Sequence, residues 1–181
     1  RRRIRTGSTT GNSISNRLRS ITSSSSDLGD SAGGAQGQAA DSDRSGYAFG
    51  TGMHETTQLC IRQLEKYVTP DSEVLDVGTG SGILGITALK LGAKHVFGTD
   101  LDENAITAVG ENLEANGIAP EQFKVVQGNI IDDKTVQDEV KYEYYDIAVA
   151  NILADVIIML QKEIPVHIKK NGIFITSGII D

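Results

Sequence analysis

From Thr56 onward the chain alternates between two patterns of hydrophobic and polar residues. Short apolar runs are typical of buried strands, and the longer segments between them carry apolar residues at helical spacing. The expected strands are 73–77, 95–99, 123–126, 145–150 and 173–176. The expected helices are one that carries Leu59, Ile61, Leu64 and Tyr67, then 82–91, 103–116 and about 153–168. This alternation predicts a doubly wound α/β fold, in which a mostly parallel sheet has helices on both faces.

Local residues also predict where the helices begin and end. Gly92 and Gly117 are placed to end two of them, because glycine readily adopts the left-handed conformation at a helix C-terminus. Either Thr56 or Thr57 is placed to cap the first helix, which is then expected to begin near Gln58.

A glycine-rich turn follows the first expected strand in the sequence Asp76-Val-Gly-Thr-Gly-Ser-Gly82. Gly78, Gly80 and Gly82 let the backbone approach a ligand closely, and the N–H groups at the start of the next helix carry partial positive charge. A carboxylate at Asp76 would repel a pyrophosphate but attract a ligand with an ammonium and a sulfonium. The turn therefore favours an S-adenosylmethionine site.

The same turn also allows a second interpretation. Gly80-Ser-Gly82-Ile-Leu-Gly85 matches the G-x-G-x-x-G dinucleotide fingerprint, and Asp100 follows about twenty residues later. In that fingerprint the first glycine turns directly off the strand, whereas here Gly78 leaves the strand two positions earlier. A nicotinamide-dependent dehydrogenase is therefore the less favoured alternative.

Polar residues stand at the ends of the later strands, where ligands of a parallel sheet bind. Asp100 is placed to accept hydrogen bonds from ribose hydroxyls, or else to cap the next helix. Asn129 and Ile130 are placed beside an adenine ring, although an Asn after Gly is also an ordinary turn residue. Asn151 is placed to accept a hydrogen bond from an attacking amine, or to cap a helix.

Composition divides the chain into two parts. Residues 1–45 are mostly small and polar with several arginines, which predicts a disordered tail; an organelle transit peptide or sequence foreign to the domain are alternatives. Residues 1–45 carry a net charge of +3 and residues 46–181 one of −10, which sum to −7 for the chain. The acidic part makes a basic protein a more favourable partner than DNA or RNA, and the alternative is that the charge simply keeps the protein soluble. The single Cys60 and three scattered histidines give no metal-ligand spacing. We expect a cytoplasmic monomer that binds no membrane.

Several motifs, in this order and spacing, closely resemble those of the bacterial ribosomal protein L11 methyltransferase family. They are Phe49-Gly-Thr-Gly-x-His54-x-Thr-Thr57, Leu75-Asp-Val-Gly-Thr-Gly-Ser-Gly-Ile-Leu84, Leu89-Lys-Leu-Gly-Ala93, Asn151-Ile-Leu-Ala154 and Ser177-Gly-Ile179. The resemblance covers 46–181. It implies a class I methyltransferase that transfers methyl groups from S-adenosylmethionine to the N-terminal amine and lysines of a large-subunit ribosomal protein.

The resemblance also implies roles for single residues. Thr57, Gly78, Asp100 and Asn151 would contact the cofactor. The loop from Phe49 through Gly50 to His54 would close over its methionine end and help shape the amine site. Apart from the resemblance, His54 is a candidate general base, and a loop-packing role for it is the favoured alternative.

Two departures from the family pattern limit these expectations. Residues 1–45 do not resemble the family's substrate-recognition domain, and the family's sheet has two strands after the fifth. The expected domain at 46–181 therefore lacks those strands. Two alternatives to the main hypothesis are a cofactor-binding fragment without turnover and an amine methyltransferase for another substrate.

Overall fold

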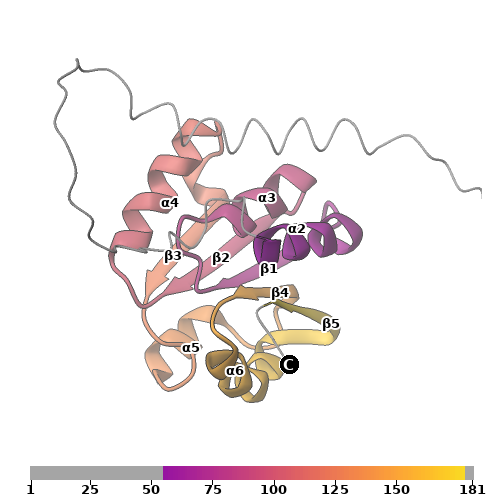
Figure 1. Ribbon diagram of the computed structural model, residues 1–181, viewed down its shortest axis with the longest axis vertical. Coiled ribbons are helices and arrows are strands. Elements are labelled where there is room, and N and C mark those ends of the chain that lie inside the picture. The colour runs from indigo at the N-terminus through magenta and orange to yellow at the C-terminus, as the bar shows by residue number, and fades with distance from the viewer. Residues whose placement is uncertain (1–54, 178–181) are drawn as a thin grey trace, which may run out of the picture. The chain divides into compact units, whose positions relative to one another are not determined.

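The computed structural model describes residues 55–177, and the expected tail at 1–45 and the predicted loop residues Phe49, Gly50 and His54 lie outside this range. Figure 1 shows the elements, which follow one another in the order α2 (Glu55–Tyr67), β1 (Glu73–Val77), α3 (Ile83–Leu91), β2 (His95–Asp100), α4 (Asn104–Ala115), the 3-10 helix η1 (Pro120–Gln122), β3 (Phe123–Gln127), α5 (Lys134–Val140), β4 (Tyr145–Asn151), α6 (Ala154–His167) and β5 (Ile168–Ser177).

Within residues 55–177 the strands form one five-stranded parallel sheet in the order β3-β2-β1-β4-β5. Asp76 of β1 lies opposite Gly98 of β2 on one side and Val149 of β4 on the other. From β1 the chain adds β2 and β3 on one side of the sheet and then β4 and β5 on the other. Such a reversal of strand order leaves a crevice outside the carboxyl ends of β1 and β4, where ligands of parallel sheets bind. The predicted doubly wound α/β fold is confirmed.

The alternating side chains of the strands build two cores, one on each face of the sheet. In Figure 1, α2, α3 and α4 cover one face, and α5 and α6 cover the other. Leu75 and Val77 point to the second face, where they pack in a cluster with Val136 of α5 and Leu160 of α6. Asp76 lies between them in sequence, so its side chain points to the opposite face, toward α3.

The structure changes several local predictions. Helix α2 already includes Glu55, so neither Thr56 nor Thr57 caps it, and the prediction that it begins near Gln58 is wrong. Gly92 and Gly117 do end their helices, with φ of 109° and 61°. Helix α5 was not predicted, because only its two buried valines are strongly apolar within a seven-residue segment.

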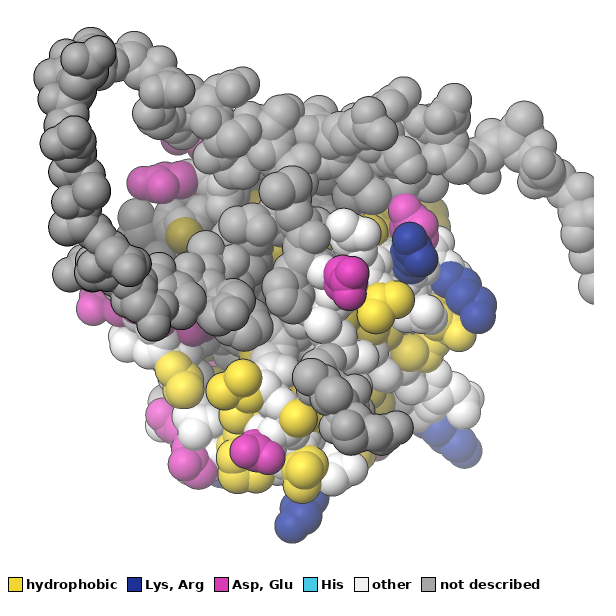
Figure 2. All heavy atoms as spheres, in the orientation of Figure 1, with side chains coloured by type: hydrophobic (Ala, Val, Ile, Leu, Met, Phe, Trp, Pro, Cys, Tyr) yellow, Lys and Arg dark blue, Asp and Glu magenta, His cyan; other side chains and the backbone are white. Residues whose placement is uncertain are grey.

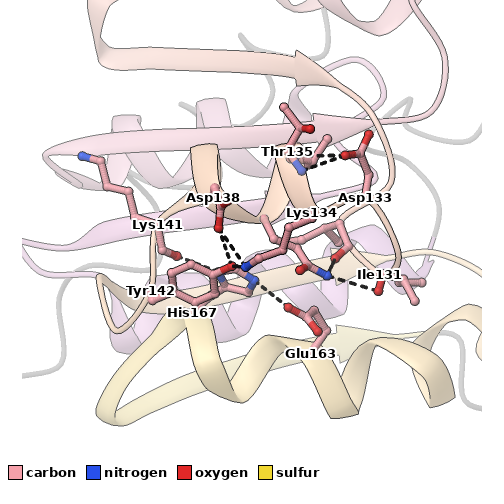
Figure 3. Close-up of polar contacts among 12 residues, drawn as sticks. Ile131, Asp133, Lys134, Thr135, Asp138, Lys141, Tyr142, Glu163 and His167 are labelled. Carbon is pink, nitrogen blue, oxygen red and sulfur yellow. Dashed lines mark hydrogen bonds and ion pairs between the residues drawn. The ribbon is translucent and has the colours of Figure 1, made fainter.

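A buried histidine joins the end of α6 to the turn between α5 and β4 (Figure 3). His167 is fully buried, and its Nδ1 lies 2.6 Å from the Lys141 carbonyl while its Nε2 lies 3.1 Å from Glu163 Oε1. The Tyr142 ring stacks on the imidazole, with 5.0 Å between the ring centroids. These contacts fix α5 against α6, and α5 in turn supports one wall of the cavity described below.

The outer face of α6 carries exposed apolar residues among its polar ones. Figure 2 shows hydrophobic side chains gathered on the lower part of the molecule, where Figure 1 places α6. Ile158, Met159 and Val166 are 58%, 49% and 44% exposed. Between residues 55 and 177 no helix combines the length and apolar character that crossing a bilayer requires.

Candidate cofactor site

A cavity of about 390 Å³ lies at the carboxyl ends of the central strands, where the reversal of strand order predicts a ligand. Residues from the ends of β1, β2 and β4, the loop after β3 and the start of α6 line it. They are Val77, Gly78, Gly80, Thr99, Asp100, Leu101, Gly128, Asn129, Ile130, Ile131, Asn151, Ile152, Leu153, Val156 and Leu160. The lining is largely apolar, and the side-chain polar groups in it are few and stand at strand ends.

The glycine turn shapes one side of this cavity. Gly78 has a φ of +69°, and a Cβ atom there would lie 2.4 Å from Ile152 Cγ2, so only glycine fits without rearrangement. The N–H groups of Gly78 and Thr79 both donate to the Thr99 carbonyl, at 2.8 and 3.1 Å. Gly78 and Gly80 line the cavity, whereas Gly82 lies at the N-cap of α3 and packs against Val109.

Asp100 joins the turn to the end of β2. Its Oδ2 accepts the Gly80 N–H at 2.8 Å, and its Oδ1 accepts the Asp102 N–H at 3.0 Å. The N-cap of α4 is Glu103, so the alternative that Asp100 caps this helix is wrong. Each carboxylate oxygen can accept more than one hydrogen bond, so the side chain retains acceptor capacity for a ligand in the cavity.

Asp76 supports the turn from beneath and is not part of the cavity lining. It is 1% exposed, and its Oδ2 accepts hydrogen bonds from Thr79 Oγ1 at 2.8 Å and from the Gly85 N–H at 3.0 Å. Burial, together with the nearby charge of Asp100, raises the pKa of this carboxyl to about 6 against the opposing effect of the two hydrogen bonds. The expected direct attraction between Asp76 and a cationic ligand is therefore replaced by an indirect role in holding the turn.

This pKa predicts a pH dependence of stability. Because the folded-state pKa of Asp76 lies above its usual value of 3.8, the stability that this group contributes is full below pH 3.8 and is lost as pH rises through 6. The loss is roughly 3 kcal/mol over the whole range, of which about 1.4 kcal/mol falls between pH 5 and pH 8. Asp76→Asn stays neutral and retains a carbonyl acceptor. Its free energy of unfolding should therefore rise relative to that of the wild type by about 1.4 kcal/mol between pH 5 and pH 8. Urea unfolding at both pH values measures it.

An exposed carboxylate provides the control for this experiment. Asp71→Asn changes the same functional group at an exposed position and should leave the slope of stability against pH unchanged. Parallel curves for the wild type and Asp76→Asn would contradict the prediction.

The loop after β3 forms a second wall, which contains the predicted Asn129 and Ile130. Asn129 Oδ1 accepts the Ile131 N–H at 3.1 Å, so this side chain does serve as a turn residue, the alternative that the sequence left open. From α5, Gln137 Nε2 donates to the carbonyls of Ile130 and Ile131, at 3.0 and 3.2 Å. No local sequence signal marked Gln137, because its role depends on a helix that was not predicted.

Asn151 lies at the end of β4 and reaches the cavity. Its Nδ2 donates to the Thr57 hydroxyl at 2.9 Å, and its Oδ1 accepts the Ser177 hydroxyl at 2.7 Å. Thr57 is fully buried and lies outside the cavity lining, so it reaches the site only through Asn151. The N-cap of α6 is Leu153, so the alternative that Asn151 caps this helix is wrong. Ser177 was not predicted as a site residue, although it too stands at a strand end.

Taken together, the parallel sheet, the glycine turn and the carboxylate at the end of β2 define a Rossmann-like domain of the class I methyltransferase type. The family described as "Ribosomal protein L11 methyltransferase (PrmA)" matches residues 43–181, and the chain belongs to this family. The resemblance inferred from the sequence motifs is confirmed.

Individual relatives agree with this assignment. A ribosomal protein L11 methyltransferase of Lachnospira eligens is 62% identical over 136 residues, which are 75% of this chain and 43% of that protein. The corresponding protein of Alkaliphilus oremlandii is 50% identical over 135 residues, again 75% of this chain, and 41% of that protein. The chain thus spans about two fifths of the length of these curated relatives.

Solved structures confirm the fold. The crystal structure of a ribosomal protein L11 methylase from Lactobacillus delbrueckii subsp. bulgaricus has a TM-score of 0.56 and 35% identity, and the match covers 67% of this chain and 59% of that one. TrmK of M. capricolum, solved with S-adenosylhomocysteine, has a TM-score of 0.51 and 16% identity, covering 67% of this chain and 51% of that one. At this identity the second likeness concerns the fold alone.

Proposed function

We propose that this chain is the catalytic domain of a protein methyltransferase that uses S-adenosylmethionine and methylates amino groups of ribosomal protein L11. The observation that carries the proposal is the cavity at the carboxyl ends of β1, β2 and β4, where Asp100 and Asn151 both reach the lining. Family membership supports the same chemistry. The amines that we propose as substrates are the N-terminal amine and lysines.

The residues of the lining fit such a cofactor. Asp100 retains acceptor capacity for two ribose hydroxyls, and Gly78 and Gly80 allow close approach of the backbone. Asn129 and Ile130 form the wall proposed for the adenine, with the apolar Ile130 against the ring. Asp76 and Gly82 act through the shape of the turn, and Thr57 acts through Asn151.

The bound cofactor supplies a methyl group on a sulfonium. The part of the protein is to hold a neutral amine in line with that carbon, and such alignment can lower the barrier by ~7–11 kcal/mol. The Asn151 carbonyl accepts an N–H of the amine and so directs the nitrogen lone pair. After transfer, the new ammonium group loses a proton to water. Phe49, Gly50 and His54 remain predicted to close over this site.

The charge of the chain supports a protein substrate. Its net charge of −7 disfavours the approach of a nucleic-acid backbone and is compatible with a basic ribosomal protein. We further propose that the protein acts as a monomer in the cytoplasm.

Methyl transfer from radiolabelled S-adenosylmethionine tests the proposal. The purified chain is incubated in parallel with ribosomal protein L11, with transfer RNA and with a small primary amine. We expect label in the ribosomal protein alone, and intact-mass spectrometry should show whole methyl increments on it. Ribosomal protein whose amines have been acetylated serves as the control and should remain unlabelled. Cofactor binding without label in any acceptor would instead support a binding domain without turnover.

A further inference from the structure

Two buried side chains hold the amide of Asn151 from opposite sides. The Ser177 hydroxyl donates to Asn151 Oδ1 at 2.7 Å, and Asn151 Nδ2 donates to the Thr57 hydroxyl at 2.9 Å. Ser177 is 8% exposed and Thr57 is fully buried. Elements β5, β4 and α2 therefore meet at one amide group that reaches the cavity.

The direction of this amide needs a specific cause. An asparagine amide can turn over and exchange the places of its oxygen and nitrogen, and a hydroxyl neighbour tolerates both orientations because it can donate or accept. In the structure the carbonyl oxygen faces Ser177, which donates its single hydroxyl hydrogen to it at 2.7 Å, and the amide nitrogen faces Thr57 at 2.9 Å. The direction of the amide therefore depends on both hydroxyls.

We propose that Ser177 is a positioning residue which, together with Thr57, fixes the direction of the Asn151 amide at the methyl-transfer site. This inference rests on the proposed function. An amide has two acceptor lone pairs and two donor hydrogens, so one of each remains after the bonds to Ser177 and Thr57. The remaining carbonyl lone pair is the one that can accept an N–H of the amine. In the turned-over amide an N–H group would oppose the amine hydrogens.

The same contacts link the site to the edge of the sheet. Ser177 lies opposite Asn151 in the pairing of β5 with β4, and β5 is an outer strand of the sheet formed by residues 55–177. Loosening this pairing would free the amide even if the rest of the cavity stayed intact. The pairing of β5 with β4 is therefore needed to hold the Asn151 amide in its direction.

Nuclear magnetic resonance of the whole ¹⁵N-labelled chain tests this arrangement without requiring turnover. The Asn151 side-chain amide is assigned by its loss in Asn151→Asp, and its exchange with solvent is measured. In Ser177→Ala we expect the protection of this amide to fall by at least about tenfold, the equivalent of one lost hydrogen bond. Ser177→Thr, which keeps the hydroxyl, should restore much of it. Thr87→Val removes another buried hydroxyl, bonded to Ile83, and should leave the Asn151 signals unchanged.

Kinetics provides a second measurement. Ser177→Ala should lower kcat about tenfold and change the KM for S-adenosylmethionine less, because the hydrogen bond that depends on the direction of the amide is the one to the amine. Thr57→Val should behave alike, and Thr57→Ser should recover activity. If Ser177→Ala does not fold, Thr57→Val takes its place in the resonance measurement, and the loss of the hydroxyl should lower the protection of the Asn151 amide in the same way.

The outcomes separate the two proposals. Identical shifts and exchange of the Asn151 amide in the wild type and Ser177→Ala would overturn the positioning role. Absence of methyl transfer by the wild-type chain would contradict the proposed function, and the resonance comparison would still decide the role of Ser177.

Discussion

Replacing Asp100 by alanine is expected to weaken binding of S-adenosylmethionine by about 100-fold or more. The carboxylate lies in the cavity lining and holds the Gly80 N–H at 2.8 Å. Its loss removes the proposed acceptors for two ribose hydroxyls, at about 1.5–3 kcal/mol for each bond to a charged group. It also frees the turn that the cofactor must contact. Isothermal titration calorimetry with S-adenosylmethionine and S-adenosylhomocysteine measures the change.

A neighbouring carboxylate provides the matched control for this experiment. Asp102 is exposed, lies outside the cavity lining and accepts the Asn104 N–H at 2.9 Å. Asp102→Ala should therefore bind the cofactor within about threefold of the wild type. Equal affinity in the wild type and Asp100→Ala would exclude Asp100 as a cofactor contact, provided that both proteins unfold cooperatively.

Replacing Gly85 by alanine is expected to destabilise the fold by about 2–3 kcal/mol. A Cβ atom at this position in α3 would lie 2.4 Å from two ring carbons of Phe123 and 2.9 Å from Val96 Cγ1. The Phe123 ring also lies within 3.4 Å of the corresponding positions at Gly82 and Gly98, so it has little space to move aside. Denaturant unfolding of the whole chain measures the loss.

A second helical glycine gives the opposite expectation. Gly110 in α4 is exposed, and no atom lies within 4 Å of an added Cβ. Gly110→Ala should therefore stabilise the protein by about 0.5–1 kcal/mol, because alanine is the better helix former. Equal stability of Gly85→Ala and Gly110→Ala would contradict the close packing of Phe123 against α3.

The sequence determined the order and type of most elements of this protein. Each strand is a short apolar run and each long helix a periodic segment, and both patterns act over a few residues. The glycine turn after β1 and the polar residues that end β2 and β4 follow from the same local information. Because the carboxyl ends of parallel strands meet at one edge, Asp100 and Asn151 could be placed together at a site before their neighbours were known.

The tertiary structure decided which way side chains point and what they contact. Asp76 was expected to attract a ligand directly, but the alternation along β1 turns it beneath the loop, toward Gly85. Helix α6 has apolar residues on both sides, and only packing on the sheet buries Leu160 and leaves Ile158 exposed. Local hydrophobicity is the same for both residues, so it could not distinguish them.

The environment of Asn151 shows the same limit. Its hydrogen-bond partners lie far away in the chain, with Thr57 94 residues before it and Ser177 26 residues after it. Such contacts form only when the folded sheet brings α2 and β5 together with β4, so a local sequence pattern does not predict them. The sequence alone therefore predicted the type of site and the strand ends that carry it, whereas the direction of each polar group depended on long-range packing.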